Sequence, residues 1–325
     1  MRTIRAGSLA TAMPLRTSPR RTFGVHTRAM LIGMTAASDF SAQALEALAR
    51  EDAARALAED IGAADLTAGL VDAHQRAHAR VLCRESAVIC GAPWAEAALR
   101  ALAPDAQIRW HVAEGGRCVR DQVVLEAQAP ARALLSAERT MLNFLQLLSA
   151  VATRTADYVD AVQGTRALIV DTRKTLPGLR RAQKYAVRCG GGTNHRIGLF
   201  DAVLIKENHI AAAGGITPVL QAAARVAAQA QFVEIEVETL SQLEQALAAG
   251  AKMILLDNMP VDALREAVRI NAGRAVLEIS GGVTLESVRA LAQTGVDRIS
   301  VGGLTKDVRA VDFSMRLQEP QCPNP

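Results

Sequence analysis

The chain has 325 residues, of which 50% are hydrophobic, 22% charged and 3% aromatic, and this composition is typical of a globular protein with a large core. No apolar run reaches the roughly 20 residues that a membrane span needs, so we expect no membrane partner. A net charge of +4 permits nucleic-acid binding, but so few aromatic residues offer little base stacking, and an anionic small substrate explains the charge equally well. We expect a cytoplasmic protein without a nucleic-acid partner.

The first 34 residues contain six arginines and no acidic residue. Such a segment resembles a transit peptide. The heavy use of Ala and Arg along the whole chain favours another interpretation, in which translation starts at Met30 or Met34 and the upstream residues are a disordered or mis-started extension. On either interpretation residues 1–34 stay outside the predicted fold.

Residues 35–148 are predicted to form an open α+β sandwich domain, because strand-like and helix-like stretches follow no steady alternation there. The expected helices cover residues 41–60 and 92–102, and the expected strands cover residues 79–84, 87–90, 108–112 and 123–127. A long helix with a substantial apolar face is expected over residues 133–162. The tail, residues 309–325, is expected to pack back on this first domain.

Residues 149–308 contain six short apolar runs, and each run ends in a residue that can take part in chemistry. The runs are residues 167–171, 202–206, 232–236, 253–257, 276–280 and 298–302. The spacing leaves room for one helix between successive runs, which predicts βα units on a parallel sheet. We expect a (β/α) barrel, open or incomplete, with about six or seven strands. Its active site is expected at the carboxyl ends of the strands.

The five cysteines form no CxxC pair and have no histidine at metal-ligand spacing. They are Cys83, Cys90, Cys118, Cys189 and Cys322. We interpret them as reduced, mostly buried thiols in preference to a disulfide or zinc role.

Cations follow the first two barrel strands, although the chain has only five lysines among 37 basic residues. Arg173 and Lys174 lie in a turn closed by Pro-Gly, which predicts an anion site. Arg196 flanks a run of three glycines that allows close approach of the backbone to a ligand. Lys206 ends the second strand, where it is either a Schiff-base lysine or a fixed cation for a carboxylate.

Acidic residues and glycine turns follow the later strands. Glu234, Glu236 and Glu238 alternate with aliphatic residues and therefore share one face of their strand. Glu236 and Asp257 are candidates for a shared Mg²⁺ site, whereas Glu234 is expected to pair with an interior Arg or Lys. The turns Ser280-Gly281-Gly282 and Val301-Gly302-Gly303 predict a phosphate site, because barrels often bind phosphate after their last strands.

Together the motifs resemble the quinolinate phosphoribosyltransferase family, from about residue 36 to residue 317. The matching motifs are ERT-LN from Glu138, DTRKTLPG from Asp171, KYAVR from Lys184 with the glycine run, NHR from Asn194, IKENH from Ile205, LLDN from Leu255, and the two glycine turns. One departure is Ala129-Pro130-Ala131-Arg132, where a glycine-containing turn is expected before the long helix.

The resemblance implies a reaction in which quinolinate attacks C1 of 5-phosphoribosyl-1-pyrophosphate (PRPP), pyrophosphate leaves and CO₂ is lost. The product is nicotinate mononucleotide. It also implies roles for individual residues. Arg173, His195, Arg196 and Lys206 would hold quinolinate, joined by Arg139 from the partner subunit of a homodimer. Lys174 would contact PRPP and pyrophosphate, Glu236 and Asp257 would face the ribose and Mg²⁺, and Ser280, Gly281, Gly282, Gly302 and Gly303 would bind the 5-phosphate.

Three alternatives remain at this point. A relative with the same fold could use another acceptor, although the Arg and His set argues for recognition of two carboxylates. Lys206 could act as a Schiff-base lyase residue. The barrel could also be a non-catalytic metabolite sensor, which is disfavoured because every expected site position is filled.

Overall fold

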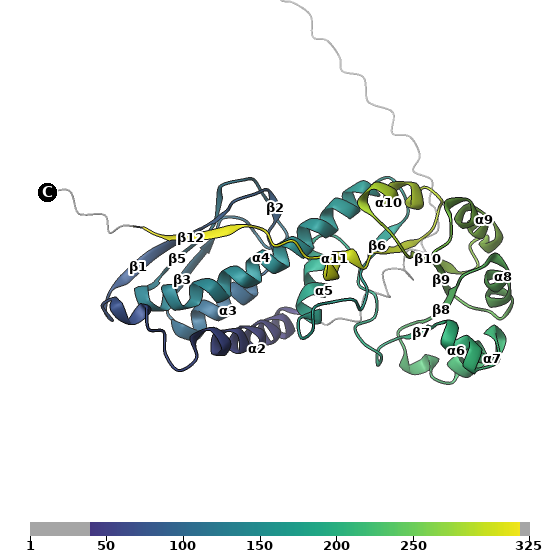
Figure 1. Ribbon diagram of the computed structural model, residues 1–325, viewed down its shortest axis with the longest axis horizontal. Helices are drawn as coiled ribbons and strands as arrows, with labels where there is room; N and C mark the ends of the chain where they lie inside the picture. The colour runs from purple at the N-terminus through teal and green to yellow at the C-terminus, as the bar shows by residue number, and fades with distance from the viewer. Residues whose placement is uncertain (1–39, 319–325) are drawn as a thin grey trace, which may run out of the picture. The chain divides into compact units, whose positions relative to one another are not determined.

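The computed structural model describes residues 40–318 (Figure 1). The predicted extension over residues 1–34 and Cys322 therefore lie outside the described residues. Two sheets dominate the fold, one antiparallel and one parallel, and the long helix α4 (Ala131–Ala161) contacts strands of both.

The first sheet has four antiparallel strands in the order β12-β1-β5-β3. Their bounds are β1 (Arg76–Cys83), β3 (Gln107–Trp110), β5 (Gln122–Pro130) and β12 (Phe313–Leu317), and a separate pair is formed by β2 (Ala87–Val88) and β4 (Arg117–Cys118). Helices α2 (Ala42–Ile61), α3 (Ala92–Leu102) and α4 pack on one another, and α4 also contacts β1 and β5. This arrangement confirms the predicted α+β domain.

Strand β12 joins this sheet from the far end of the chain. It pairs antiparallel with β1 from Phe313 opposite Cys83 to Leu317 opposite Ala79. The sequence predicts that the tail packs back on this domain, but it does not predict a strand there. Residues 319–325 lie outside the described residues.

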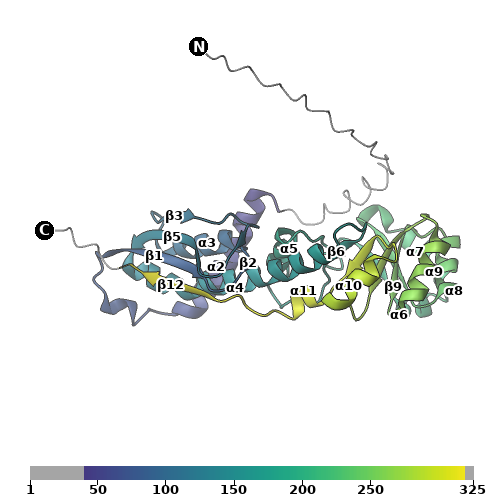
Figure 2. The same cartoon turned by 90° about the horizontal axis from the view of Figure 1, so that it is seen from above.

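Helix α4 begins directly after β5, without the glycine turn that the family resemblance led us to expect. Pro130 is the residue before the helix, with φ −53° and ψ 133°. The proline ring fixes φ near this value and needs no N–H partner, so the strand passes into the helix without a loop. Figure 2 shows α4 running from the antiparallel sheet toward the parallel one. Its buried residues belong to both cores, Leu134 and Leu145 to the first, Leu148 and Val151 to the second.

The second sheet has six parallel strands in the order β6-β11-β10-β9-β8-β7. Their bounds are β6 (Leu168–Val170), β7 (Val203–Ile205), β8 (Val233–Val237), β9 (Met253–Asp257), β10 (Val276–Ser280) and β11 (Arg298–Ser300). All six predicted runs are strands. The first two strands in sequence, β6 and β7, are the two edges of the sheet, so the barrel is open, as predicted.

Helices connect these strands and cover the sheet (Figures 1 and 2). They are α5 (Arg180–Cys189), α6 (Glu207–Ala212), α7 (Ile216–Ala224), α8 (Leu240–Ala248), α9 (Val261–Asn271), α10 (Leu285–Ala292) and α11 (Gly303–Lys306). The aliphatic residues of β8, β9 and β10 are almost completely buried, including Ile235, Ile254 and Leu277. These aliphatic side chains therefore pack with those of the covering helices in one apolar core.

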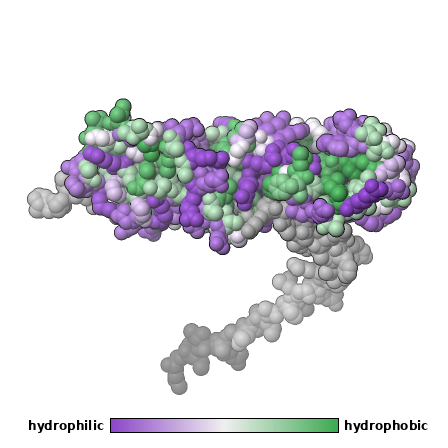
Figure 3. All heavy atoms as spheres, turned by 90° about the horizontal axis from the view of Figure 1, so that it is seen from below, coloured by the Kyte–Doolittle hydropathy of each residue, from purple (hydrophilic) through white to green (hydrophobic). Residues whose placement is uncertain are grey.

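Among residues 40–318, no helix combines the length and the apolar character that crossing a bilayer would need. Figure 3 shows hydrophilic residues distributed over the visible face, with apolar residues interspersed.

Candidate active site

A cavity of about 340 Å³ lies at the carboxyl ends of the parallel strands. It is lined by Asp171, Thr172, Arg173, Lys174, His195, Arg196, Leu204, Lys206, Glu236, Leu255, Ser280 and Ser300. Seven of the predicted site residues are in this set: Arg173, Lys174, His195, Arg196, Lys206, Glu236 and Ser280. The lining residues thus come from all six parallel strands or from the loops next to them.

Other predicted site residues do not line this cavity. Arg139 is exposed on α4. Asp257 is half-buried at the end of β9, where its carboxylate accepts a hydrogen bond from Asn258 Nδ2 at 2.7 Å. The glycines, Gly281, Gly282, Gly302 and Gly303, lie in the turns after β10 and β11.

The cavity is cationic, and three of its cations have no acidic partner. Among residues 40–318, no carboxylate oxygen lies within 4.0 Å of a side-chain nitrogen of Arg173, Lys174 or Arg196. The Nε atoms of both arginines are buried without a protein hydrogen-bond partner in this part of the chain. Burial and the neighbouring Arg173 both lower the pKa of Arg196. Two guanidinium groups held close together in this way favour an anion between them.

Asp171 organises the loop that carries His195 and Arg196, two of the residues that the sequence predicts to bind substrate. Its carboxylate accepts hydrogen bonds from the His195 N–H at 2.8 Å and from Asn194 Nδ2 at 2.6 Å. It also forms a fully buried ion pair with Lys184 of α5, whose Nζ donates to the His195 carbonyl at 3.0 Å. The glycine run before this loop allows the chain to turn back, so that Thr193 bridges Val170. His195 and Arg196 are therefore held against the end of β6.

His195 lies between the cavity and the barrel interior. Its Nε2 is 2.7 Å from Glu234 Oε2, and its Nδ1 accepts a hydrogen bond from the Arg196 N–H at 2.8 Å. In this geometry the ring carries its proton on Nε2. Burial lowers the pKa of His195, but Glu278 and Glu234 outweigh burial, and the pKa lies above its ordinary value. The direct partner of Glu234 is thus a histidine and not the predicted Arg or Lys.

Beneath His195, a buried polar network fills the barrel interior. Glu278 of β10 accepts a hydrogen bond from Arg298 Nε at 2.6 Å and another from the Ser300 hydroxyl. Burial raises the pKa of Glu278, but Arg298 and His195, together with the Ser300 hydrogen bond, outweigh burial and keep that pKa below its usual value. Ser300 also lines the cavity, so the network connects the barrel interior with the site.

Lys206, which follows β7, forms an ion pair with Glu236 of β8 in the wall of the cavity, with Nζ 2.6 Å from Oε2. The Lys206 N–H also donates to His209 Nδ1 at 3.0 Å, which fixes the start of α6. An ammonium group that is paired with a carboxylate is a fixed cation and not a nucleophile. This geometry therefore disfavours Schiff-base chemistry at Lys206.

The turn that carries Lys174 is held from two sides. The Lys174 carbonyl accepts a hydrogen bond from Thr305 Oγ1 of α11 at 2.7 Å, and the Lys174 N–H donates to Thr172 Oγ1 at 3.1 Å. A Cβ atom on Gly302 would lie 3.2 Å from Lys174 Cδ, so the turn after β11 lies directly against this lysine. One predicted phosphate turn is therefore adjacent to the predicted PRPP lysine.

In the turn after β10, position 281 can be occupied only by glycine. Gly281 has φ +99°, and a Cβ atom there would lie 1.9 Å from Asn258 Oδ1. The Asn258 N–H also donates to the Ser280 carbonyl at 3.0 Å. These contacts join the ends of β9 and β10 and place Ser280 at the edge of the cavity.

Sequence reasoning missed Asp171 and Lys184 as a pair, and it missed Glu278 and Arg298. Glu278 carried a usable signal, because an acid two residues before the end of an apolar strand repeats the position of Glu234. Side chains alternate between the two faces of a strand, so Glu234 and Glu278 both point into the barrel. The contact between Asp171 and Lys184 depends on how α5 folds back on β6, and no spacing rule gives it.

Comparisons with known proteins agree on one family. Residues 65–149 match the model for "Quinolinate phosphoribosyl transferase, N-terminal domain", and residues 151–316 match the model for its C-terminal domain. The chain is 45% identical over 276 residues to the nicotinate-nucleotide pyrophosphorylase [carboxylating] of Mycobacterium leprae, covering 83% of this chain and 97% of that protein. It is 42% identical over 257 residues to a probable enzyme of the same name from Bacillus subtilis, covering 79% and 89%.

Solved structures give the same result. The nicotinate-nucleotide pyrophosphorylase from Francisella tularensis matches with a TM-score of 0.81 at 42% identity, covering 84% of this chain and 97% of that one. A structure from Ehrlichia chaffeensis with the same enzyme name matches with a TM-score of 0.79 at 37% identity, covering 82% and 98%.

Proposed function

Because this chain belongs to the quinolinate phosphoribosyltransferase family, we propose that its cationic cavity is where quinolinate and PRPP meet. The reaction transfers the phosphoribosyl group of PRPP to quinolinate and releases pyrophosphate and CO₂. It forms nicotinate mononucleotide, a step of de novo NAD biosynthesis. What remains to be assigned is the role of each residue.

The observation that carries the assignment is the group of unpaired cations. Quinolinate brings two adjacent carboxylates, and the buried Nε atoms of Arg173 and Arg196 lack protein partners among residues 40–318, although Arg196 Nη1 donates to the Ala202 carbonyl at 3.2 Å. Guanidinium forks match carboxylates in charge and shape. In our proposal these two arginines, with His195 and Lys206, hold the quinolinate carboxylates.

PRPP would bind beside the pyridine ring. Lys174 is the exposed cation of the turn after β6, next to Gly302, and we assign it to PRPP and the departing pyrophosphate. Ser280, Gly281, Gly282, Gly302 and Gly303 would take the 5-phosphate through backbone N–H groups and the serine hydroxyl. Binding both substrates in one cation-rich cavity offsets their mutual repulsion and sets the ring nitrogen against C1 of the sugar.

The chemistry then needs little proton transfer from the protein. As pyrophosphate leaves, C1 becomes cationic, and the Glu236 carboxylate near the ribose favours that state. The ring nitrogen becomes positively charged once it is alkylated, and it accepts the electron pair released when the 2-carboxylate departs as CO₂. This explains why the site, as residues 40–318 build it, contains several cationic groups that bind anions and no obvious general base.

Glu236 and Asp257 fit a Mg²⁺ ion that arrives with PRPP. Glu236 is the last residue but one of β8 and lies opposite Leu255, two residues before Asp257 at the end of the adjacent parallel strand β9. Both carboxylates are hard oxygen donors. Mg²⁺ is commonly held by one or two carboxylates together with substrate phosphates. When bound, the ion would neutralise charge on the pyrophosphate leaving group. Glu236 Oε2 already accepts a hydrogen bond from Lys206 Nζ, so the protein would contribute few ligands to the ion.

We also propose that the enzyme acts as a homodimer in the cytoplasm. Arg139 belongs to a matching family motif, yet it is exposed on α4 and does not line the cavity of its own chain. A role in the cavity of a partner subunit reconciles the two facts. All four cysteines among residues 40–318 are free, which suits a reducing compartment.

The test is an assay of CO₂ and pyrophosphate release from quinolinate, PRPP and Mg²⁺, with nicotinate as the control acceptor. We expect equal amounts of both products from quinolinate and no pyrophosphate from nicotinate. Turnover with nicotinate and no CO₂ from quinolinate would refute the proposal.

A further inference from the structure

A second group of reactive side chains converges outside the active site. The Sγ atoms of Cys90 and Cys189 and a carboxylate oxygen of Glu114 all lie within 4.8 Å of one another. Cys90 follows β2, Glu114 lies in the connection from β3 to β4, and Cys189 is the last residue of α5. None of the three has a part in the proposed reaction. We call them the Cys90 cluster.

The fold fixes all three donors. Both oxygens of Glu114 accept backbone hydrogen bonds, from the Gly91 N–H at 2.9 Å and the Ala92 N–H at 3.0 Å. Cys90 is bonded through its N–H and its carbonyl to the buried Ser149 hydroxyl, at 3.0 and 3.1 Å. The end of α5 is pressed against α4, since a Cβ atom on Gly190 would lie 2.3 Å from the Ala152 carbonyl.

The cluster is acidic and lacks a basic partner. Among the described residues, no Lys, Arg or His nitrogen lies within 4.0 Å of the Glu114 carboxylate. Burial is the main cause that raises the pKa of Glu114, and burial together with Cys189 raises the pKa of Cys90. Burial also raises the pKa of the adjacent Tyr185. Deprotonation of these buried groups is costly unless a cation binds at the same time.

We propose that Cys90, Glu114 and Cys189 bind one thiophilic divalent cation, with Zn²⁺ as the cellular ion. Thiolate ligands select Zn²⁺ over Mg²⁺, so this site differs in chemistry from a carboxylate site for Mg²⁺. Zn–S bonds of about 2.3 Å place tetrahedral sulfur ligands about 3.8 Å apart, so the side chains need to move by only about 1 Å. Three protein ligands leave the fourth position for water.

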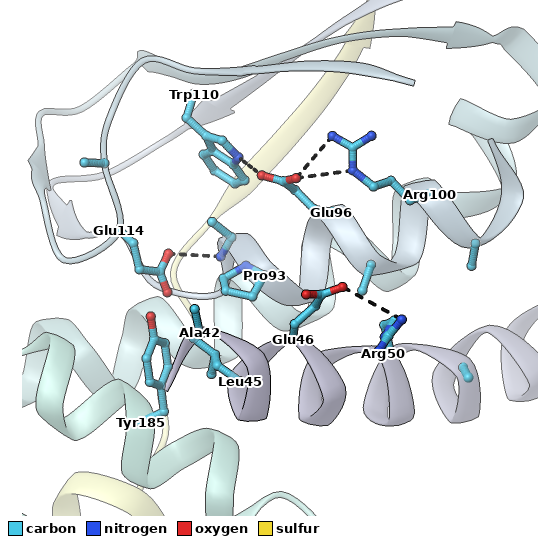
Figure 4. Close-up of a pocket in the computed structure, with 15 residues that line it drawn as sticks. Ala42, Leu45, Glu46, Arg50, Pro93, Glu96, Arg100, Trp110, Glu114 and Tyr185 are labelled. Carbon is cyan, nitrogen blue, oxygen red and sulfur yellow. Dashed lines mark hydrogen bonds and ion pairs between the residues drawn. The ribbon is translucent and has the colours of Figure 1, made fainter. Parts of the chain in front are cut away.

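A cavity of about 820 Å³ provides the entry path. It lies between α2 and α3 and is lined by Glu114 and Tyr185, among others (Figure 4). Figure 4 shows the Tyr185 hydroxyl directed toward the Glu114 carboxylate, at the end of the cavity nearest α5. Glu114 is the member of the Cys90 cluster that lines this cavity, so an ion that enters here reaches its carboxylate.

Binding would tie two parts of the fold together. Cys189 immediately precedes the glycine run that leads to His195 and Arg196, whereas Cys90 and Glu114 belong to the first domain. Because the unfolded chain cannot present the three ligands together, bound metal stabilises the folded state. We therefore expect Zn²⁺ to raise the melting temperature.

The chain supplies a matched control in a second cysteine pair. Cys83 and Cys118 are both buried and both donate to the Glu85 carbonyl, at 3.1 and 3.9 Å. Burial, opposed by that carbonyl, raises the pKa of Cys83 to about 12. Among residues 40–318, no His or carboxylate joins these two thiols in a group with metal-ligand spacing. A metal site that depends on the complete Cys90 cluster will not respond to Cys118→Ser.

The experiment is a Co²⁺ titration of the reduced, chelator-treated full chain, with Cys322→Ser in every protein to remove a cysteine outside the described residues. We expect one equivalent of Co²⁺ with a thiolate charge-transfer band, displaced by Zn²⁺. Cys189→Ser and Cys90→Ser should each abolish the band, and Glu114→Gln should weaken binding at least about tenfold. Cys118→Ser should bind as the parent does.

A second measurement needs no substitution in the cluster. Zn²⁺ should protect Cys189 of the parent protein from alkylation by a maleimide, as located by peptide mass spectrometry, and should raise its melting temperature. Absence of a thiolate band and of protection in the parent protein would overturn the proposal. So would a band that survives Cys189→Ser, or a Cys90–Cys189 disulfide that forms in place of metal binding.

Discussion

Asp171 and Lys184 form an ion pair with both side chains completely buried, directly behind the loop that carries His195 and Arg196. Each partner also bonds this loop, Asp171 through the His195 N–H and Lys184 through the His195 carbonyl. The pair therefore does two things: it satisfies two buried charges, and it orients the residues that we assign to quinolinate.

The variant Asp171→Asn is expected to lower the free energy of unfolding by about 3–5 kcal/mol, because it leaves the Lys184 charge buried without a partner. Urea denaturation measures this loss. The control is Asp262→Asn, which breaks an exposed pair with Arg265 and should cost less than about 1 kcal/mol. A similar, small loss for both variants would contradict the role of the buried pair.

The variant Arg173→Ala is expected to lower kcat/KM for quinolinate by about 100-fold or more, since a charged donor to a substrate carboxylate contributes about 3 kcal/mol or more. The PRPP dependence should change much less. Arg181→Ala is the matched control, because this arginine is exposed on α5 and does not line the cavity. If Arg173→Ala retains the parent kcat/KM for quinolinate, the assignment is wrong.

The variant Lys174→Ala is expected to act on the other substrate. The substitution removes a cation from the turn that lies against Gly302. The KM for PRPP should therefore rise about tenfold or more, while the KM for quinolinate changes less. Steady-state kinetics with each substrate varied in turn measures the difference. An unchanged dependence on PRPP would count against this role for Lys174.

The variant Arg139→Ala tests whether active sites are shared between subunits. Mixed with the strongly impaired Arg173→Ala chain, it should restore part of the activity, because one site of the heterodimer then has both arginines. Each variant alone should remain impaired. No recovery in purified, verified heterodimers would indicate that each chain supplies its whole site.

Much of the barrel could be predicted from the sequence, because its strands are short apolar runs separated by helix-length spacers. The site followed from the same pattern, since parallel strands present their carboxyl ends on one side. Arg173 and Lys174, which follow β6, could thus be assigned to one cavity with Lys206, which follows β7.

Other features depend on contacts that no local pattern encodes. Strand β12 has only five residues and is specified by its pairing with β1. Glu234 was correctly expected to need an interior partner, but the identity of that partner depends on how the loop after β6 returns His195 to the barrel. The approach of Cys90 to Cys189 likewise arises from the packing of α5 against α4, and the cysteine spacing gave no sign of it.

The most direct test of the cationic cavity uses a substrate analogue that cannot react. Phthalate has the two adjacent carboxylates of quinolinate but no ring nitrogen, and benzoate has only one carboxylate. Inhibition against varied quinolinate should be competitive, with phthalate binding at least about tenfold more tightly than benzoate, and Arg173→Ala should remove most of that preference. Equal inhibition by the two acids, or a preference that survives Arg173→Ala, would contradict the account.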